Sequence, residues 1–218
     1  MEADHRRLDD VAGSVSRETF DRLLGFQELF ARWAETINLV ARSTLDQLWT
    51  RHVLDSAQLL KLMPAARSWL DLGSGGGFPG AVIAIVMAER GGSVELVESN
   101  GKKAAFLRTA LAAAGAPARV FRCRIEDAPG RVRLPEVVTA RALAPLPLLF
   151  DLAAPWLQGG AVGLFHKGRD AAREIEEALR SWSFDLVQHR SAVDSDGVVL
   201  ELRHLSPRQI MPKPRAHR

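Results

Sequence analysis

Five glycines follow an acidic residue within the ten positions from Asp71 to Gly80. A short apolar run of strand length contains Asp71, and an apolar run of helical character follows Pro79. Glycine accepts positive φ angles and lets a ligand approach the backbone, so this loop presents bare N–H groups at the positive end of a helix dipole. Such a loop, at the carboxyl edge of a sheet, is typical of sites for nucleotide-like ligands.

The glycine pattern is compatible with two candidate ligands. The segment from Gly75 to Gly80 matches G-x-G-x-x-G, which is typical of dinucleotide sites, but a run so rich in glycine satisfies many patterns. Asp71 would repel a pyrophosphate and suits the ammonium group of a methionine moiety. The order acid-x-Gly-x-Gly-x-Gly therefore resembles the S-adenosylmethionine loop of class I methyltransferases. Glu98 is spaced to accept hydrogen bonds from the ribose of either cofactor, and a purely structural glycine turn is the third interpretation.

A second polar group lies upstream of the loop. His52, Asp55 and Ser56 fall at i, i+3 and i+4 of an expected helix, so they can share one patch. Either His52 and Asp55 form a buried pair that orients the helix against the sheet, or they contact a substrate. Within the loop, Phe78 either packs against a cofactor or plugs the top of the core.

The elements that must position these residues alternate from Ser68 onward, which predicts βαβ units and a parallel sheet. The expected strands lie at 68–72, 94–98, 118–125, 137–140, 161–165, 184–189 and 198–205. Besides the helix after Pro79, helices are expected at 17–35, 43–62, 102–114, 145–156 and 170–182. A chain that ends on a hairpin after five βα-type units is typical of class I methyltransferases rather than of two-part dinucleotide dehydrogenases.

This pattern divides the chain into four parts. Residues 1–15 are polar and predicted to be disordered. Residues 16–66 form a helical cap whose second helix begins at Ser43 or Thr44. Residues 67–206 form a Rossmann-like domain, and residues 207–218 form a basic tail.

The composition narrows the classes of function. The 218 residues are 47% hydrophobic and 25% charged, as in a soluble globular protein. No apolar run has the length of a membrane span and no signal peptide is recognisable, so we expect a cytoplasmic protein without a membrane partner. The single cysteine, Cys123, excludes an internal disulfide framework, and no histidine pair has metal-ligand spacing, so no metal is expected.

The net charge of +3 does not identify a partner, but its distribution is informative. Basic residues and no acids follow Glu201, which favours a polyanion such as nucleic acid or leaves a solvated terminus. Arg119, Arg122 and Arg124 interleave with apolar residues along the third expected strand, which predicts an exposed strand face.

Six ordered motifs resemble a specific family, the bacterial 16S ribosomal RNA guanine-N7 methyltransferases, also called glucose-inhibited division protein B. The resemblance spans residues 20–205. The motifs are Ile37-Asn38-Leu39, His52-x-x-Asp55-Ser56, the loop from Asp71 to Gly80, Glu98-Ser99-x-x-Lys102-Lys103-x-x-Phe106-Leu107, Thr139-Ala140-Arg141-Ala142 and Lys167-Gly168. The chain departs from the family pattern at Glu98, where Asp is more usual, at Asn100, and in its shorter basic tail.

The resemblance implies an α/β class I S-adenosylmethionine-dependent methyltransferase fold. This fold has a Rossmann-like seven-stranded sheet, mostly parallel with an antiparallel last strand, and here an N-terminal helical cap. The implied cofactor is S-adenosyl-L-methionine. The resemblance and the glycine-loop pattern together predict the residues that contact this cofactor. They are Asp71, Gly73, Gly75, Gly77, Phe78, Glu98, Ser99, Asn100, Ile125, Glu126 and Arg141. The implied partner is 16S ribosomal RNA or the small-subunit ribonucleoprotein, acted on by a monomer.

Methylation at N7 of guanine needs no general base, because N7 carries a free lone pair and no proton. The sequence is consistent with a reaction that needs no base. It lacks the Asp/Asn-Pro-Pro-aromatic motif used to bind exocyclic amines, and its only cysteine lies inside an expected strand, which disfavours C5-pyrimidine methylation through a thiolate adduct. Arg141 is the expected catalytic residue. It either clamps the cofactor carboxylate, contacts guanine O6 or a phosphate, or forms a structural salt bridge with Asp71. Lys167 either meets RNA phosphate or is solvated.

Two other classes of function remain open on the sequence alone. The first is an NAD(P)-binding oxidoreductase, which Asp71 and the terminal hairpin disfavour. The second is a non-catalytic nucleic-acid-binding module, which the intact cofactor loop disfavours.

Overall fold

The computed structural model describes residues 1–40 and 46–208 and is built around a seven-stranded sheet. The strand order is β3-β2-β1-β4-β5-β7-β6. The strands are β1 (Ser68–Leu72), β2 (Ser93–Val97), β3 (Ala118–Phe121), β4 (Val137–Arg141), β5 (Val162–Lys167), β6 (Trp182–Arg190) and β7 (Val198–Pro207). β1 to β5 pair in parallel, and β7 runs antiparallel to both β5 and β6. The predicted mostly parallel sheet with an antiparallel last strand is confirmed.

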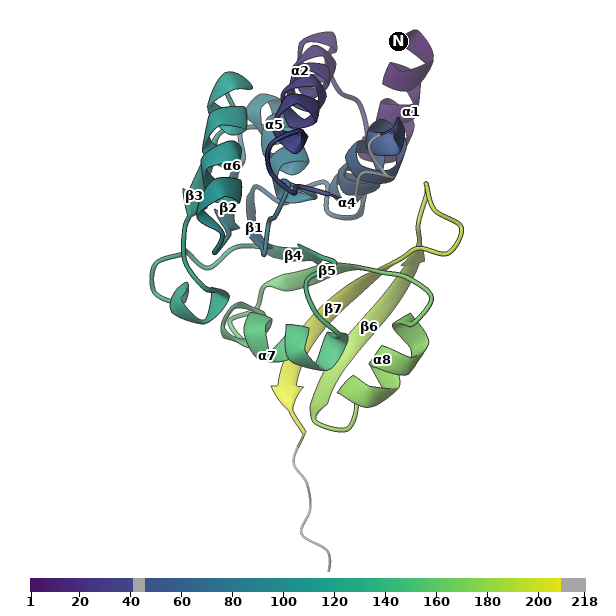
Figure 1. Cartoon of the computed structure of the whole chain (residues 1–218). Coiled ribbons are helices and arrows are strands. Elements are labelled where there is room, and N and C mark those ends of the chain that lie inside the picture. Colours follow the sequence, from purple (N-terminus) through teal and green to yellow (C-terminus); the bar gives the residue numbers. More distant parts are fainter. Residues whose placement is uncertain (41–45, 209–218) are drawn as a thin grey trace, which may run out of the picture.

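Helices cover both faces of this sheet (Figure 1). α5 (Gly80–Arg90) and α6 (Gly101–Ala113) lie on the face that also carries the N-terminal helices, while α7 (Leu146–Leu157) and α8 (Ala171–Ala178) lie on the other. Every residue of α5 from Gly80 to Met87 is buried. This helix packs against β2 on one side and α2 (Arg17–Ala34) on the other, which explains why its sequence is apolar all round.

Aromatic side chains join the helical cap to the sheet domain. The ring centroid of Phe30 in α2 lies 5.3 Å from that of Phe78 in the glycine loop and 5.6 Å from that of Phe106 in α6. Phe26, one turn earlier, packs 5.7 Å from Phe78 in an edge-on arrangement. The buried side chains of the cap and of this sheet face therefore form one continuous core.

The prediction that residues 1–15 are disordered is wrong. They contain α1 (Glu2–Ala12), in which Leu8 and Ala12 are buried, and Val15 is buried just after it. The guanidinium of Arg90 at the end of α5 donates hydrogen bonds to the carbonyl oxygens of Ala12 and Ser14 at 3.0 and 3.3 Å. Most of the polar residues that suggested disorder lie on the exposed face of this helix, but the ring of His5 stacks on Phe20 of the cap at 4.8 Å.

The second cap helix is interrupted rather than continuous. Its predicted start at Ser43 or Thr44 lies outside the described residues. Trp49–Leu54 is π-helical and is followed by the short pieces α3 (Asp55–Ala57) and α4 (Leu59–Leu62). The hydroxyl of Ser56 donates to the carbonyl of His52 at 2.6 Å at this point. Such π-turns are frequent at functional sites, and this one carries His52.

The larger differences from the predicted boundaries are in β3, α8 and β6. β3 ends at Phe121, the residue paired with the last residue of β2, so the chain has no further partner and turns into the short helix Ile125–Asp127. α8 ends at Ala178, and β6 begins at Trp182, whose ring packs edge-on against Phe150 at 6.4 Å. Most of the predicted basic tail, residues 209–218, lies outside the described residues. Within the described part of the chain, no helix is long and apolar enough to cross a membrane.

Candidate functional site

The glycine loop is held open by a carboxylate at the end of β2. Gly73, Gly75 and Gly77 all have positive φ angles, between 55° and 93°. Glu98 accepts a hydrogen bond from the backbone N–H of Gly75 through Oε2 and one from Asn100 through Oε1, both at 2.7 Å. The carboxylate therefore ties the loop to the start of α6, and each oxygen keeps a further acceptor position.

A cavity of about 240 Å³ lies between this loop and the chain after β3. Six of the predicted cofactor residues line it: Gly73, Gly75, Glu98, Ser99, Ile125 and Glu126. The walls combine an acceptor carboxylate with apolar side chains from Val97, Ile125 and Leu152. Ribose hydroxyls require acceptors and a flat base requires apolar walls, so the residues present fit the nucleoside part of S-adenosylmethionine.

The other predicted loop residues shape the loop from beneath. Asn100 caps α6 through its side-chain oxygen, which accepts from the N–H groups of Lys102 and Lys103. A Cβ on Gly77 would come within 2.8 Å of Ala81, so only glycine lets the loop approach α5 so closely. Phe78 is 6% exposed and packs among Phe26, Phe30 and His52, which matches the expected plug of the core.

Asp71 is fully buried beneath the loop. Its Oδ2 accepts from the backbone N–H of Gly80 at 3.2 Å, and its Oδ1 accepts from the hydroxyl of Thr139 at 2.9 Å. Burial raises the pKa of Asp71 to about 6, although these hydrogen bonds oppose the shift. Asp71 thus fastens β1 to β4 and to the start of α5, and it does not line the nucleoside cavity.

Arg141, at the end of β4, is held by the helical cap. Its Nη1 donates to the carbonyl of Arg51 at 3.1 Å and to Oδ2 of Asp55 at 3.2 Å, and its Nη2 contacts Nδ1 of His52. The guanidinium also lies 5.3 Å from the centroid of the Phe78 ring. The carboxylate partner is therefore Asp55, and the alternative of a salt bridge to Asp71 is wrong.

His52 is neutral at physiological pH. Burial of the imidazole, followed by the positive charge of Arg141, lowers the pKa of His52 to about 4. A neutral ring offers a lone pair at Nδ1, which accepts from the guanidinium. His52 and Asp55 thus orient Arg141 across the boundary between cap and sheet, which extends the predicted buried pair to a third residue. Ser56 is fully buried and bonded only within its own helix, so it serves the π-turn.

Sequence reasoning missed His166, which lies beside Arg141 in the sheet. The parallel register of β4 and β5 pairs Arg141 with His166. The Nε2–H of His166 donates to the backbone carbonyl of Asp55 at 2.9 Å, and burial lowers the pKa of the ring. The sequence signal that could have identified His166 is its position at the carboxyl end of the fifth expected strand, directly before Lys167.

Gln58 was also missed, and it connects the cap to the β6–β7 hairpin. Its Nε2 donates to Oδ1 of Asp55 at 2.7 Å, and its Oε1 accepts from the backbone N–H of Ala192 at 2.9 Å. Ser191 in the same hairpin lies 3.3 Å from the Gln58 amide. The hairpin and Arg141 are therefore linked through Asp55.

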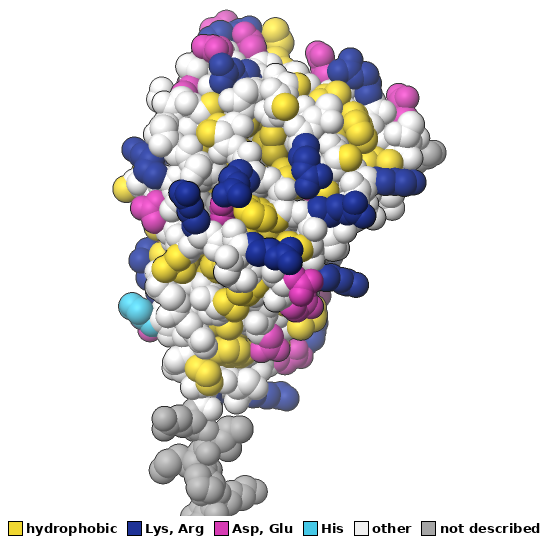
Figure 2. Space-filling model, turned by 90° about the vertical axis from the view of Figure 1, so that its left-hand side faces the viewer, with side chains coloured by type: hydrophobic (Ala, Val, Ile, Leu, Met, Phe, Trp, Pro, Cys, Tyr) yellow, Lys and Arg dark blue, Asp and Glu magenta, His cyan; other side chains and the backbone are white. Residues whose placement is uncertain are grey.

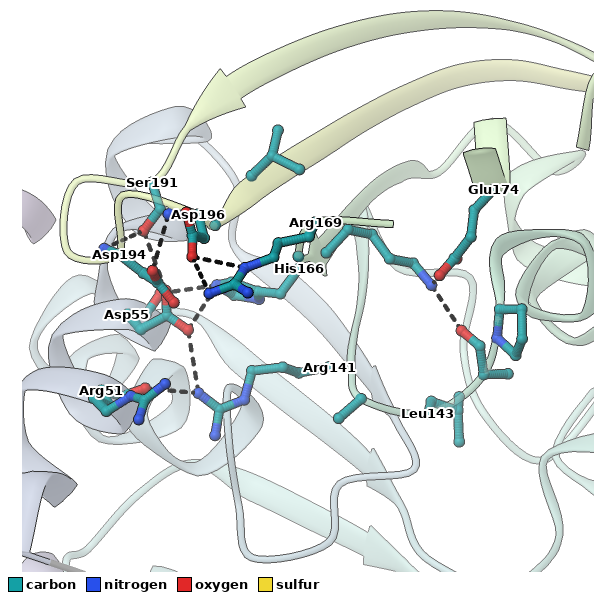
Figure 3. A pocket seen from close by; sticks show the side chains of 17 residues that line it. Arg51, Asp55, Arg141, Leu143, His166, Arg169, Glu174, Ser191, Asp194 and Asp196 are labelled. Atoms are coloured by element: carbon teal, nitrogen blue, oxygen red, sulfur yellow. Dashed lines mark hydrogen bonds and ion pairs between the residues drawn. The ribbon is translucent and has the colours of Figure 1, made fainter. Parts of the chain in front are cut away.

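Arg141, Asp55, His166 and Ser191 border a pocket of about 610 Å³ between the cap, the ends of β4 and β5, and the hairpin (Figure 3). Arg141 and Asp55 point toward each other on one side of the pocket, and Glu174 lies on the opposite side. The ammonium of Lys167 donates to Glu174 and to the carbonyl of Ala144, both at 2.7 Å, and its side chain is 9% exposed. The solvated-lysine alternative is therefore wrong, and Lys167 fixes the start of α7.

Leu143 forms the wall between the cavity and the pocket, because it lines both. A Cβ on Gly73 would come within 2.5 Å of Leu143 Cδ1, so the leucine rests directly on the glycine loop. The preceding residue, Ala142, has an unusual φ of 51° that turns the chain toward the loop. The nucleoside cavity and the pocket that holds Arg141 therefore meet at one side chain.

Among the described residues, no group of three or more His, Cys, Asp or Glu side chains could hold a metal ion. The arrangement instead brings a nucleoside cavity against a pocket with a fixed guanidinium. The chemistry that it supports is transfer between two bound molecules by positioning.

Two solved structures of low sequence identity share this fold, and one of them is described as a methyltransferase. Cofactor-bound Rv0187 from MTB aligns with 89% of this chain and 92% of its own at a TM-score of 0.57 and 19% identity. An O-methyltransferase from Bacillus cereus in complex with SAH covers 93% and 97% at a TM-score of 0.57 and 16% identity.

Sequence comparison gives a narrower result. A protein of Chelativorans sp. called ribosomal RNA small subunit methyltransferase G is 60% identical over 91% of this chain and 95% of its own. The protein of the same name from Brucella canis is 56% identical over 94% and 98%. Residues 19–204 match the sequence profile of the family described as GidB, rRNA small subunit methyltransferase G. The chain belongs to this family.

Proposed function

We propose that this protein transfers a methyl group from S-adenosylmethionine to N7 of one guanine in 16S ribosomal RNA. The observation that carries the proposal is the meeting of a nucleoside cavity and an arginine-lined pocket at Leu143, in a chain of the rRNA small subunit methyltransferase G family. S-adenosylmethionine supplies an electrophilic methyl group on a positively charged sulfur.

The residues of the chain position the two reactants. Glu98 would accept hydrogen bonds from the ribose hydroxyls of the bound cofactor, and Ile125 and Leu152, which line the same cavity, would flank its base. Arg141 donates a hydrogen bond to guanine O6, the acceptor beside N7, which leaves the N7 lone pair free. His52 and Asp55 keep the guanidinium in this orientation through their contacts with Nη2 and Nη1.

The electrostatics of the pocket suit the product. Methylation at N7 makes the guanine positively charged, and four carboxylates and four cationic side chains line the pocket. Asp55, Glu174 and Asp196 are paired with Arg141, Lys167 and Arg169, whereas Asp194 forms no ion pair with a described residue. The nearby imidazoles of His52 and His166 have lowered pKa values and so add no positive charge. Asp194 is therefore the carboxylate available to stabilise the positive charge that develops on the base.

The decisive experiment compares 16S ribosomal RNA from cells with and without this gene by strand scission specific for N7-methylguanosine. We expect one scission site that is lost with the gene and restored by the wild-type protein, but not by Arg141→Ala. Identical scission patterns in both strains would reject the substrate. A calorimetric titration with S-adenosylmethionine, NAD and NADP separates this function from an oxidoreductase.

The preferred form of the RNA follows from the size of the protein. A chain of 218 residues has little surface with which to read a long RNA sequence, so we expect the folded RNA, with or without ribosomal proteins, to be a better substrate than short oligonucleotides. The monomeric state and the cytoplasmic location stay predictions. Gel filtration and cell fractionation test them.

A further inference from the structure

The positive charge of this protein is concentrated in one segment. Residues 99–134 contain eight basic and two acidic residues and carry a formal charge of +6, so the other residues together carry −3. The basic residues are Lys102, Lys103, Arg108, Arg119, Arg122, Arg124, Arg131 and Arg133. We call the surface that they form the α6–β3 basic face.

Contacts made by four of these residues tie α6, β3 and the segment after β3 to one another and to β2. Arg108 in α6 donates from Nη2 to the carbonyl of Val120 in β3 at 3.0 Å. The guanidinium of Arg122 lies over the start of α6, where a Cβ on Gly101 would come within 2.9 Å of its Cζ. Arg119 and the backbone of Arg133 both contact Glu95 in the neighbouring strand. Figure 2 shows Lys and Arg side chains gathered across the middle of this side of the molecule.

Most of these charges lack a carboxylate partner. Only Arg119 forms an ion pair with a described residue, at 3.4 Å from Glu95. Several arginines on other surfaces are paired, including Arg22 with Glu18, Arg173 with Glu177 and Arg203 with Glu201. Like charges that face one another without counter-charges repel, and a polyanion relieves this repulsion.

The need to protect the edge of the sheet from pairing with another sheet does not explain the α6–β3 basic face. Charged side chains on an edge strand prevent pairing with another sheet. β3 is such an edge strand, but of the eight basic residues only Arg119 lies within it. The others extend over α6 and the loops after β3, and Lys103 and Arg124 also line the nucleoside cavity. The basic face therefore borders the reaction site.

We propose that the α6–β3 basic face binds the phosphate backbone of the substrate RNA, away from the guanine that is methylated. This inference rests on the proposed function for the identity of the polyanion. Binding through phosphates selects the folded shape of the RNA rather than its base sequence and makes affinity fall with salt.

The test uses three positions that lack an ion pair with a described residue and do not line the cavity: Arg122→Gln, Arg131→Gln and Arg133→Gln in one variant. Arg119 is kept, because its loss would leave Glu95 unpaired. The control, Arg6→Gln, Arg7→Gln and Arg180→Gln, removes three exposed charges from α1 and the turn after α8, on the opposite side in Figure 1. Of these, only Arg6 forms an ion pair with a described residue, Glu2, and this pair is exposed. Melting temperatures confirm that both variants fold.

Binding of protein-free 16S ribosomal RNA from the gene-deletion strain is measured between about 50 and 200 mM salt, without cofactor. We expect the face variant to bind roughly tenfold more weakly at low salt, with a salt slope reduced by about 2 to 3. The KM for RNA rises while kcat and the affinity for S-adenosylmethionine stay unchanged, because the reacting groups are untouched. The control variant behaves as the wild type.

Three outcomes would overturn the inference. One is an unchanged affinity and salt slope in the face variant, and another is a wild-type protein that binds no RNA. The third is an activity loss confined to assembled small subunits with unchanged binding of free RNA, which assigns the face to an acidic protein. Loss of RNA binding in the variant, together with a wild type that leaves N7 unmethylated, would keep this inference and reject the proposed reaction.

Discussion

At the residue scale, the function of this protein depends on how Arg141 is held. Three acceptors from the π-helical turn and the start of α3 surround its guanidinium: the carbonyl of Arg51, the carboxylate of Asp55 and the neutral ring of His52. A planar fork with several donors can satisfy such a set, and an ammonium group cannot. The arginine lines the 610 Å³ pocket and not the nucleoside cavity, which favours contact with the guanine over a clamp on the cofactor.

Arg141→Lys therefore tests the role of this side chain. We expect kcat to fall roughly 100-fold, because a donor fixed beside the reacting atom is lost. The affinity for S-adenosylmethionine, measured by calorimetry, stays within about threefold of the wild type. Arg169→Lys is the matched control, because Arg169 lines the same pocket but is exposed and paired with Asp196. A large loss of cofactor affinity would instead place Arg141 on the cofactor carboxylate.

The neutral state of His52 makes a pH prediction. Its pKa falls from 6.5, the ordinary value for histidine in an unfolded chain, to about 4 in the folded protein. Between these values the unfolded chain binds more protons, so this group makes the free energy of unfolding rise with pH over this window. Asp71, with its pKa raised to about 6, acts in the opposite direction, but this contribution is common to the wild type and a His52 variant.

We therefore compare the wild type with His52→Gln by urea unfolding at several pH values. The difference in unfolding free energy should grow from about pH 4 to about 6.5 and stay constant above it. A difference that does not change with pH would show that the pKa of His52 is the same in the folded protein as in the unfolded chain.

At the element scale, the glycine loop and the β4–α7 connection form the two reactant sites together. Leu143 packs on Gly73, and the Lys167–Glu174 pair holds the far end of the same connection. The loop itself depends on positive φ angles that β-branched residues resist.

Gly75→Val should abolish binding of S-adenosylmethionine and leave the fold intact. Gly75 has a φ of 55°, and its N–H is bonded to Glu98. Valine would strain this turn and displace the carboxylate that receives the ribose. Calorimetry measures the binding and circular dichroism the fold. Gly25→Ala in α2, where an added Cβ meets nothing within 4 Å, is the control and should bind cofactor normally. Normal binding by folded Gly75→Val would disprove the loop assignment.

At the scale of the whole molecule, the cap is part of the main core rather than an appendage. The buried cluster extends from Leu8 in α1 through α2 and α5 to the sheet. A cap that shares its core with the sheet must unfold together with it. This also keeps Arg141, which belongs to the sheet, in register with His52, which belongs to the cap.

Leu8→Ala tests this continuity. Removal of a fully buried leucine side chain should cost about 2–5 kcal/mol of unfolding free energy, in one cooperative transition. Leu134→Ala, at a leucine that is 58% exposed, is the control and should cost little. Urea unfolding followed by tryptophan fluorescence and circular dichroism measures both. Two separate transitions would show that the cap folds independently.

The sheet, the glycine loop and the family could all be predicted from the amino-acid sequence. Strand-length apolar runs and glycine spacing are local signals, and the motifs from Asp71 to Lys167 stand in a recognisable order. The family comparison confirms the methyltransferase class and the family that those motifs predicted. The helix α1 was not predicted, because its few apolar residues give no clear helical pattern by themselves. They are buried only by contact with the surface of the cap.

The pairing of the polar residues, in contrast, depends on the tertiary structure. Arg141 and Asp55 are 86 positions apart, and nothing local shows that they pair rather than Arg141 and Asp71. The register of β4 and β5 brings His166 beside Arg141, and the path of the hairpin brings Ala192 to Gln58. Long-range pairing depends on strand order and on the packing of the cap, which single-residue patterns do not contain.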